Sequence, residues 1–154
     1  MSRIAGNLAR GALAGAAGTT ALNVVTYLDM VARGRGTSST PEQTVEALAD
    51  HAGVTVPGDE ETRQNRVAGL GPMLGIASGV VTGALLALAY DGRRPPLVVG
   101  GVLASVGAMV GTDAPMAVLG VTSPRSWSAT DWVSDAIPHA AYGLATAAAL
   151  RLMP

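Results

Sequence analysis

The sequence predicts an all-α integral membrane protein in which four helices cross the bilayer. Three observations support this prediction: only 14% of the 154 residues are charged, the mean hydropathy is +0.36, and four apolar segments have near-spanning length. An ordinary soluble domain has about 25% charged residues. We expect a single membrane domain over residues 1–154, with spans at about 11–32, 67–90, 97–113 and 131–152 and a polar insert at 34–66.

The first apolar segment contains 22 residues, and as a helix it would extend about 33 Å. This length exceeds a hydrocarbon core of about 30 Å. A cleaved signal peptide is the alternative, but this segment is longer than a usual signal core and contains the polar residues Asn23, Tyr27 and Asp29. Gly11 and Gly15 begin a small face at four-residue spacing, which favours close helix packing.

The polar insert predicts one short amphipathic helix. Its start is indicated by Thr40-Pro41-Glu42-Gln43, with threonine as the N-cap and proline in the first turn, and we expect the helix to end near His51. The acids that follow suit the N-terminal turn of the next helix, where the helix dipole favours negative charge; they are Asp59, Glu60 and Glu61.

The second apolar segment contains four glycines at strict four-residue spacing, which are Gly71, Gly75, Gly79 and Gly83. Each interior glycine costs a soluble helix about 1 kcal/mol relative to alanine. In lipid, by contrast, small residues let two helix backbones approach closely. We therefore interpret the four glycines as a helix-packing face, with the Gly11 and Gly15 face as its partner within the chain. It is also the surface we expect to be used in any self-association.

The third and fourth segments differ in their polar residues. The polar turn 91–96 makes the second and third segments an antiparallel pair, and Asp113 and Pro115 predict a break in the third helix. Residues 116–121 are apolar again, and their pattern leaves open whether they re-enter the bilayer. Ser128 and Asp131 have the spacing of an N-terminal capping box for the last helix.

Four spans with short connections place several polar residues near one leaflet. Asp135 and His139 are four residues apart on one helical face, and the end of the third segment brings Asp113 to the same side. A charged side chain at the bilayer centre costs about 2.5–3.5 kcal/mol, so such groups usually pair inside the bundle. We consider three roles for Asp113, Asp135 and His139: structural hydrogen bonding, a proton or ion relay, and a polar ligand pocket.

Several functional classes lack support in the sequence. There is no cysteine, which excludes disulfides and thiolate chemistry, and two distant histidines give no metal-binding motif. The serines and threonines of the apolar segments have no adjacent base, and the net charge of −1 does not favour nucleic acid. We therefore expect a non-enzymatic protein without cofactor or metal.

The orientation in the membrane is nearly balanced, because five arginines flank each side of the predicted bundle. Arginines before the first span and the Arg93-Arg94 turn favour cytoplasmic termini under the positive-inside rule. We therefore expect a multi-pass protein of the bacterial plasma (inner) membrane with both termini in the cytoplasm.

Two stretches resemble those of small uncharacterised actinobacterial membrane proteins, TTALNVVTYLDMVARGRGTSSTPEQ and GVTSPRSWSATDWVSDAIPHAAYGL. More remotely, a glycine-rich first span, a polar insert, and a last span with His139, Tyr142 and Gly143 are similar to the YagU-like inner-membrane proteins. The latter resemblance implies a connection with acid tolerance and assigns no catalytic residue.

Three functions are compatible with the sequence. The first is a non-enzymatic membrane protein whose helices pack through glycine faces and which can self-associate as a homo-oligomer. The second is a small proton- or ion-coupled transporter or channel that uses Asp113, Asp135 and His139, since buried charges and broken helices mark transport sites. The third is an accessory subunit that binds an unknown protein partner through the acidic insert.

Overall fold

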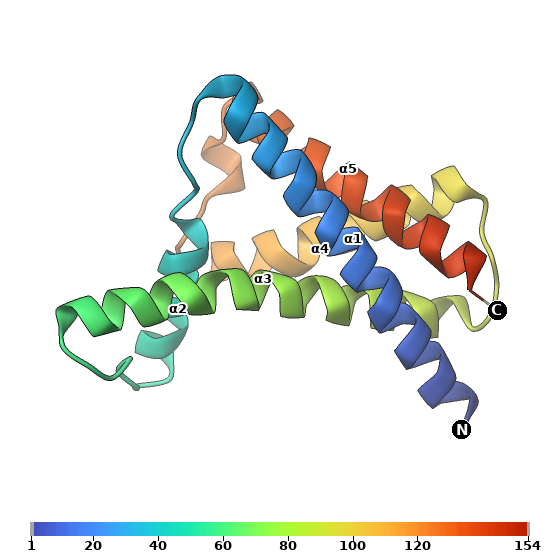
Figure 1. Cartoon of the computed structure of the whole chain (residues 1–154), viewed down its shortest axis with the longest axis horizontal. Coiled ribbons are helices and arrows are strands. Elements are labelled where there is room, and N and C mark those ends of the chain that lie inside the picture. The colour runs from blue at the N-terminus through green and yellow to red at the C-terminus, as the bar shows by residue number, and fades with distance from the viewer. Residues whose placement is uncertain (1, 154) are drawn as a thin grey trace.

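The computed structural model describes residues 2–153 and confirms the all-α fold, with no strand in that range. Five α-helices follow one another along the chain (Figure 1), together with a single 3-10 turn, η1, at Pro124–Ser126. The helices are α1 (Arg3–Arg33), α2 (Thr40–His51), α3 (Glu60–Tyr90), α4 (Leu97–Val118) and α5 (Ala129–Leu152).

Two of the long helices begin well before the apolar segments that they contain. Helix α1 begins eight residues before the predicted span, with the Ser2 hydroxyl accepting a hydrogen bond from the Ala5 N–H. Helix α3 begins at Glu60, because the Asp59 side chain caps it by accepting from the Thr62 N–H at 2.8 Å. Hydrogen bonds from Thr62 also lower the pKa of the Asp59 carboxyl group. Hydropathy locates the apolar part of a helix, whereas capping residues determine where the helix starts.

The insert contains the predicted short helix, α2, with one change at its start. The N-cap is Ser39, and Thr40 is already the first helical residue, so the prediction of Thr40 as N-cap was wrong by one position. The Gln43 side chain donates to the Ser39 hydroxyl at 3.1 Å, which is the backward bond of a capping motif made to the residue before Thr40. Helix α2 packs on the N-terminal half of α3, where Arg63 binds Glu46 at 2.7 Å.

The four long helices form two crossing pairs, α1 with α3 and α4 with α5 (Figure 1). Helix α1 contacts both α3 and α5, and α4 packs mainly on α5. The contact between α3 and α4 is smaller, although these two helices are joined by the short turn after Tyr90. Helices α1 and α5 are therefore the central pair of the structure.

Helix α1 crosses α3 where glycines of the two helices face each other. A Cβ atom built on Gly83 would lie 2.6 Å from the Gly15 Cα, and one built on Gly11 would lie 2.6 Å from the Ala84 Cα. Likewise, a Cβ on Gly15 would lie 3.1 Å from the Val80 Cα, next to Gly79. Only residues without side chains permit this backbone approach.

The remaining two glycines of the α3 face have other surroundings. A Cβ on Gly71 would meet Pro41 of α2 at 3.0 Å, whereas no described atom of another element lies within 4 Å of the corresponding position at Gly75. Three of the four glycines are therefore used inside one chain. Gly75 alone of this face is open to a second copy.

The contact between α4 and α5 also depends on a small residue. A Cβ on Gly143 of α5 would lie 2.7 Å from the Ser105 N of α4, and one on Gly101 would lie 2.9 Å from the Leu144 Cδ2. Ala104 and Ala108 of α4 are buried beside Tyr142 of α5. Close packing through small residues is thus used twice in the structure.

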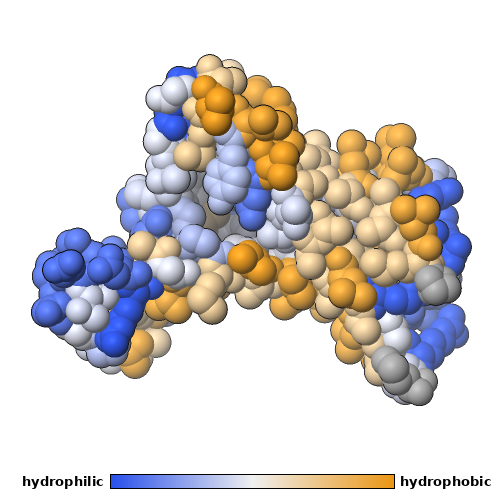
Figure 2. All heavy atoms as spheres, in the orientation of Figure 1, coloured by the Kyte–Doolittle hydropathy of each residue, from blue (hydrophilic) through white to orange (hydrophobic). Residues whose placement is uncertain are grey.

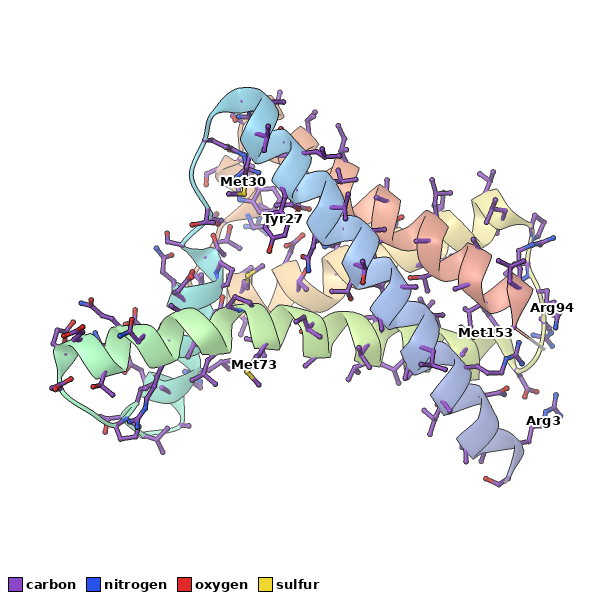
Figure 3. All side chains as sticks on the ribbon, viewed as in Figure 1. Arg3, Tyr27, Met30, Met73, Arg94 and Met153 are labelled. Carbon is purple, nitrogen blue, oxygen red and sulfur yellow. The ribbon has the colours of Figure 1, made fainter. Side chains whose placement is uncertain are left out.

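Hydrogen bonds tie the helices together at one end of the molecule. There, Arg10 donates to the carbonyls of Leu150 and Met153, Arg151 donates to that of Pro95, and Arg94 donates to that of Met153. Figure 3 shows Arg3, Arg94 and Met153 at this end. We call it the terminal end, because residues 2 and 153 both lie there.

The opposite end holds the start of α5, the end of α1 and the insert. Arg33 of α1 donates to the Ser134 hydroxyl of α5 at 2.8 Å, which joins these two helices. We call it the insert end. Figure 2 shows hydrophilic residues gathered towards both ends, with hydrophobic residues over much of the surface between them.

Apolar side chains are distributed differently from those of a soluble protein. Among residues 2–153, twenty-seven large apolar residues are exposed, whereas the buried apolar set has eight members, of which five are alanine. Polar residues occupy central positions instead, including Thr19, His139 and Thr146. Soluble proteins rarely expose extended apolar surfaces of this kind.

Two of the described helices, α3 and α4, are long and apolar enough to cross a membrane. Of the residues in their most apolar 18-residue windows, only 11% and 22% are buried, so both helices are largely exposed. Helices α1 and α5 carry more polar residues and do not meet the same criterion. The structure thus shows two candidate spans of the four that the sequence predicts.

Candidate functional site

The candidate site begins at a firmly held helix start. Ser128 and Asp131 form the predicted capping box of α5: the Ser128 hydroxyl accepts from the Asp131 N–H at 3.2 Å, and Asp131 accepts from the Ser128 N–H at 2.9 Å. The rings of Trp127 and Trp132 pack edge to face with centroids 4.9 Å apart. These contacts fix the first turn, from which the site residues of α5 follow.

Asp135 and His139 form a close pair one turn apart on α5. The His139 Nδ1 lies 3.3 Å from the Asp135 Oδ1 and 2.9 Å from the Asp135 backbone carbonyl oxygen. His139 is 8% exposed, so its ring is held in the interior. The second carboxylate oxygen, Asp135 Oδ2, is buried and has no hydrogen-bond partner among the described residues.

Asp113 reaches this pair from α4. Its side chain is half-buried, and it interacts electrostatically with both Asp135 and His139. Asp113 therefore belongs to the same electrostatic cluster as Asp135 and His139. Spacing predicted the pair on α5, and topology brought α4 to it.

The predicted helix break at Asp113-Ala114-Pro115 was wrong. Helix α4 runs without interruption from Leu97 to Val118, with Pro115 inside its last turn. Proline removes one hydrogen bond and crowds the carbonyl four residues earlier, but this disturbance is limited to one turn, and α4 continues for three residues beyond Pro115. The Thr112 hydroxyl donates to the Ala108 carbonyl at 3.0 Å within the same stretch.

The segment 116–121 is divided between two structures. Residues 116–118 complete α4, and the chain then turns through Gly120, whose φ of +73° lies in the left-handed region that glycine adopts freely. The 3-10 turn η1 follows before α5. This turn places Asp113 and Asp135 on adjoining helix ends.

Ionic groups of α1 border the site. Asp29 and Arg33, four residues apart on α1, form an ion pair at 3.5 Å, but the Arg35 Nε lies closer to Asp29, at 2.6 Å. Arg35 follows the left-handed Gly34, which turns the chain so that Arg35 returns to α1. Helical spacing could not predict this second partner, because it lies beyond the helix end.

Tyr142 lies one turn deeper than His139, at the centre of the four long helices. Its side chain is 1% exposed, its hydroxyl donates to the Gly79 carbonyl of α3 at 2.6 Å, and a Cβ on Gly18 of α1 would lie 2.8 Å from its ring. Thr146, one turn further, is fully buried, and its hydroxyl has no partner among the described residues.

The sequence patterns predicted no structural or functional role for Tyr142 or Thr146. One signal was available, because Tyr142 is the single aromatic residue in the stretch 133–152. An isolated large side chain among alanines and glycines has to be accommodated by small residues on its neighbours. Gly18, Gly79 and Ala104 supply that space.

The site has the chemistry of a proton-holding group. Two carboxyl groups and one imidazole lie together, and an imidazole paired with a carboxylate can gain or lose a proton near neutral pH. Within residues 2–153, no group of three or more histidines and acids has the arrangement of a metal site. Searches of protein-family models, curated proteins and solved structures found no match to this chain.

Proposed function

We propose that this is a non-enzymatic integral protein of the bacterial plasma membrane, with α1, α3, α4 and α5 as its four spans. The observation that carries the proposal is the exposure of α3 and α4, whose apolar windows are largely unburied. Exposed leucine, valine and isoleucine side chains are stabilised when lipid replaces water around them. The small and polar residues at the centre then provide helix contacts that do not depend on hydrophobic burial.

The proposal extends to α1 and α5 because of their position. Both lie against the exposed apolar helices, and together they join the same two polar ends. A bundle that crosses the bilayer with α3 and α4 would carry α1 and α5 with it. Inside the bundle, the hydroxyl groups of the buried threonines of these two helices would form hydrogen bonds or be kept away from lipid, as polar groups in membranes require.

Extraction of membranes with alkaline carbonate tests this proposal. We expect the protein to remain in the sedimented membranes, as integral proteins do, and to require detergent for release. Recovery in the carbonate supernatant, or in the soluble fraction without detergent, would contradict the proposal.

A second candidate function, proton or ion movement, is favoured by the convergence of Asp113, Asp135 and His139. Asp135 Oδ2 is buried and has no hydrogen-bond partner among residues 2–153, and Asp113 of α4 interacts electrostatically with Asp135. Intramembrane acids and histidines that face a bundle interior often serve as proton relays. The alternative is structural, since the same groups hold α4 and α5 together.

Proteoliposomes loaded with a pH-sensitive dye separate these roles. If the residues form a relay, Asp135→Asn and His139→Ala should each abolish a wild-type proton flux, with the variants shown to be folded by a cooperative thermal unfolding transition. His51→Ala is the matched control, because His51 lies exposed at the end of α2. Wild-type flux equal to that of empty vesicles would remove the relay and leave the structural role.

A further inference from the structure

The terminal end gathers arginines with little opposing charge. Arg3, Arg93 and Arg94 are exposed there, and Arg10 and Arg151 join them from α1 and α5. Asp91 is the one acid at this end, and it binds Arg3 at 3.3 Å. Four arginines therefore remain without an acidic partner among the described residues at this end.

Two small hollows lie between the helices beside these arginines. Both are lined by Tyr90 of α3, Arg93 of the α3–α4 turn and Leu150 of α5, and one of them also by residues of α1. Each has room for about one water molecule, and Ala87, Ala147 and Leu150 contribute apolar surface to one or both of them. The hollows thus combine cationic and apolar walls.

Two guanidinium groups retain unused hydrogen-bond donors. Arg10 donates through Nη2 to two main-chain carbonyls, but its Nε is buried and has no acceptor among residues 2–153. A buried N–H group without an acceptor is costly. Arg93 makes no side-chain hydrogen bond to a described residue and is exposed beside both hollows.

We propose that the terminal end binds the phosphate of an anionic phospholipid. Arg93, Arg94 and Arg151 would surround the phosphate, and the exposed apolar side chains that adjoin them in the chain, Leu97 and Leu152, would contact the acyl chains. Guanidinium groups bind phosphate oxygens through charged hydrogen bonds, and arginines at a membrane surface attract anionic lipids. This inference rests on the proposed membrane location, and a lipid is favoured over free phosphate because the exposed apolar side chains of Leu97 and Leu152 adjoin the arginines.

Native mass spectrometry of the detergent-purified protein tests the inference. Phosphatidylglycerol and phosphatidylcholine with the same acyl chains are titrated separately, and inorganic phosphate is added as a competitor. We expect preferential binding of phosphatidylglycerol, weakened about fivefold for each arginine removed in Arg93→Gln and in the double variant with Arg94→Gln. Binding of phosphatidylcholine should not change.

Arg125→Gln is the matched control, because Arg125 is exposed at the insert end, and it should bind phosphatidylglycerol as the wild type does. Equal binding of both lipids, or equal loss in the control, would overturn the inference. Complete competition by inorganic phosphate without lipid preference would overturn the assignment to a lipid. A protein that resists carbonate extraction but shows no lipid preference would refute this inference alone.

Discussion

Replacing Gly83 by leucine is expected to force α1 away from α3 and to destabilise the protein by about 3 kcal/mol or more. A Cβ at this position would lie 2.6 Å from the Gly15 Cα and 2.7 Å from the Gly15 N, so the atoms it meets belong to the backbone and cannot rotate away. For a chain of 154 residues, this loss corresponds to a fall of about 6–12 °C in the thermal unfolding midpoint. The tryptophan fluorescence of Trp127 and Trp132 in detergent provides the measurement.

Gly75→Leu is the control for this change, since it introduces the same side chain into the same helix. No described atom of another element lies within 4 Å of a Cβ there, and leucine favours the helix more than glycine does. We expect an unchanged or slightly higher midpoint. Equal destabilisation by the two substitutions would show that α3 does not pack on α1 as described.

Tyr142→Ala is expected to cost about 3–5 kcal/mol, because it removes a buried ring from the place where all four long helices meet. The ring contacts Gly18 of α1 and packs with Ala104 and Ala108 of α4, while the hydroxyl reaches α3. The neighbours are small residues in close backbone contact, so they cannot move in to fill the space. The unfolding midpoint in detergent measures the loss.

Two further variants accompany this one: the first separates the ring from the hydroxyl, and the second is a control at an exposed tyrosine. Tyr142→Phe keeps the ring and loses the bond to Gly79, for which we expect a cost of about 1 kcal/mol. Tyr27→Ala removes a tyrosine that is 58% exposed and should have little effect in detergent. A midpoint for Tyr142→Ala no lower than that for Tyr27→Ala would refute the central role of Tyr142.

Part of this fold could be predicted from local chemistry. Composition predicts the helical class, Ser128 and Asp131 predict the start of α5, and helical spacing predicts the Asp135–His139 pair. These predictions depend on residues within one or two turns of each other. Glycine spacing also suggested that α1 and α3 are partners, because two bare faces can approach where other faces cannot.

Features that depend on three-dimensional surroundings could not be predicted in this way. Pro115 was interpreted as a break, but a helix can continue through a proline at the loss of one hydrogen bond, and the sequence does not mark the end of α4 at Val118. Arg35 binds Asp29 only because Gly34 turns the chain back. The position of Tyr142 requires three other helices to be placed first.

The proposed function requires the polypeptide to cross the bilayer between its terminal and insert ends. The chain has no cysteine, so a single one can be introduced at each end, as Arg93→Cys or Asp50→Cys, both at exposed positions. Labelling with a membrane-impermeant maleimide should modify the Arg93→Cys variant only in inside-out vesicles and the Asp50→Cys variant only in intact spheroplasts. Labelling of both variants from the same side of the membrane would contradict the account.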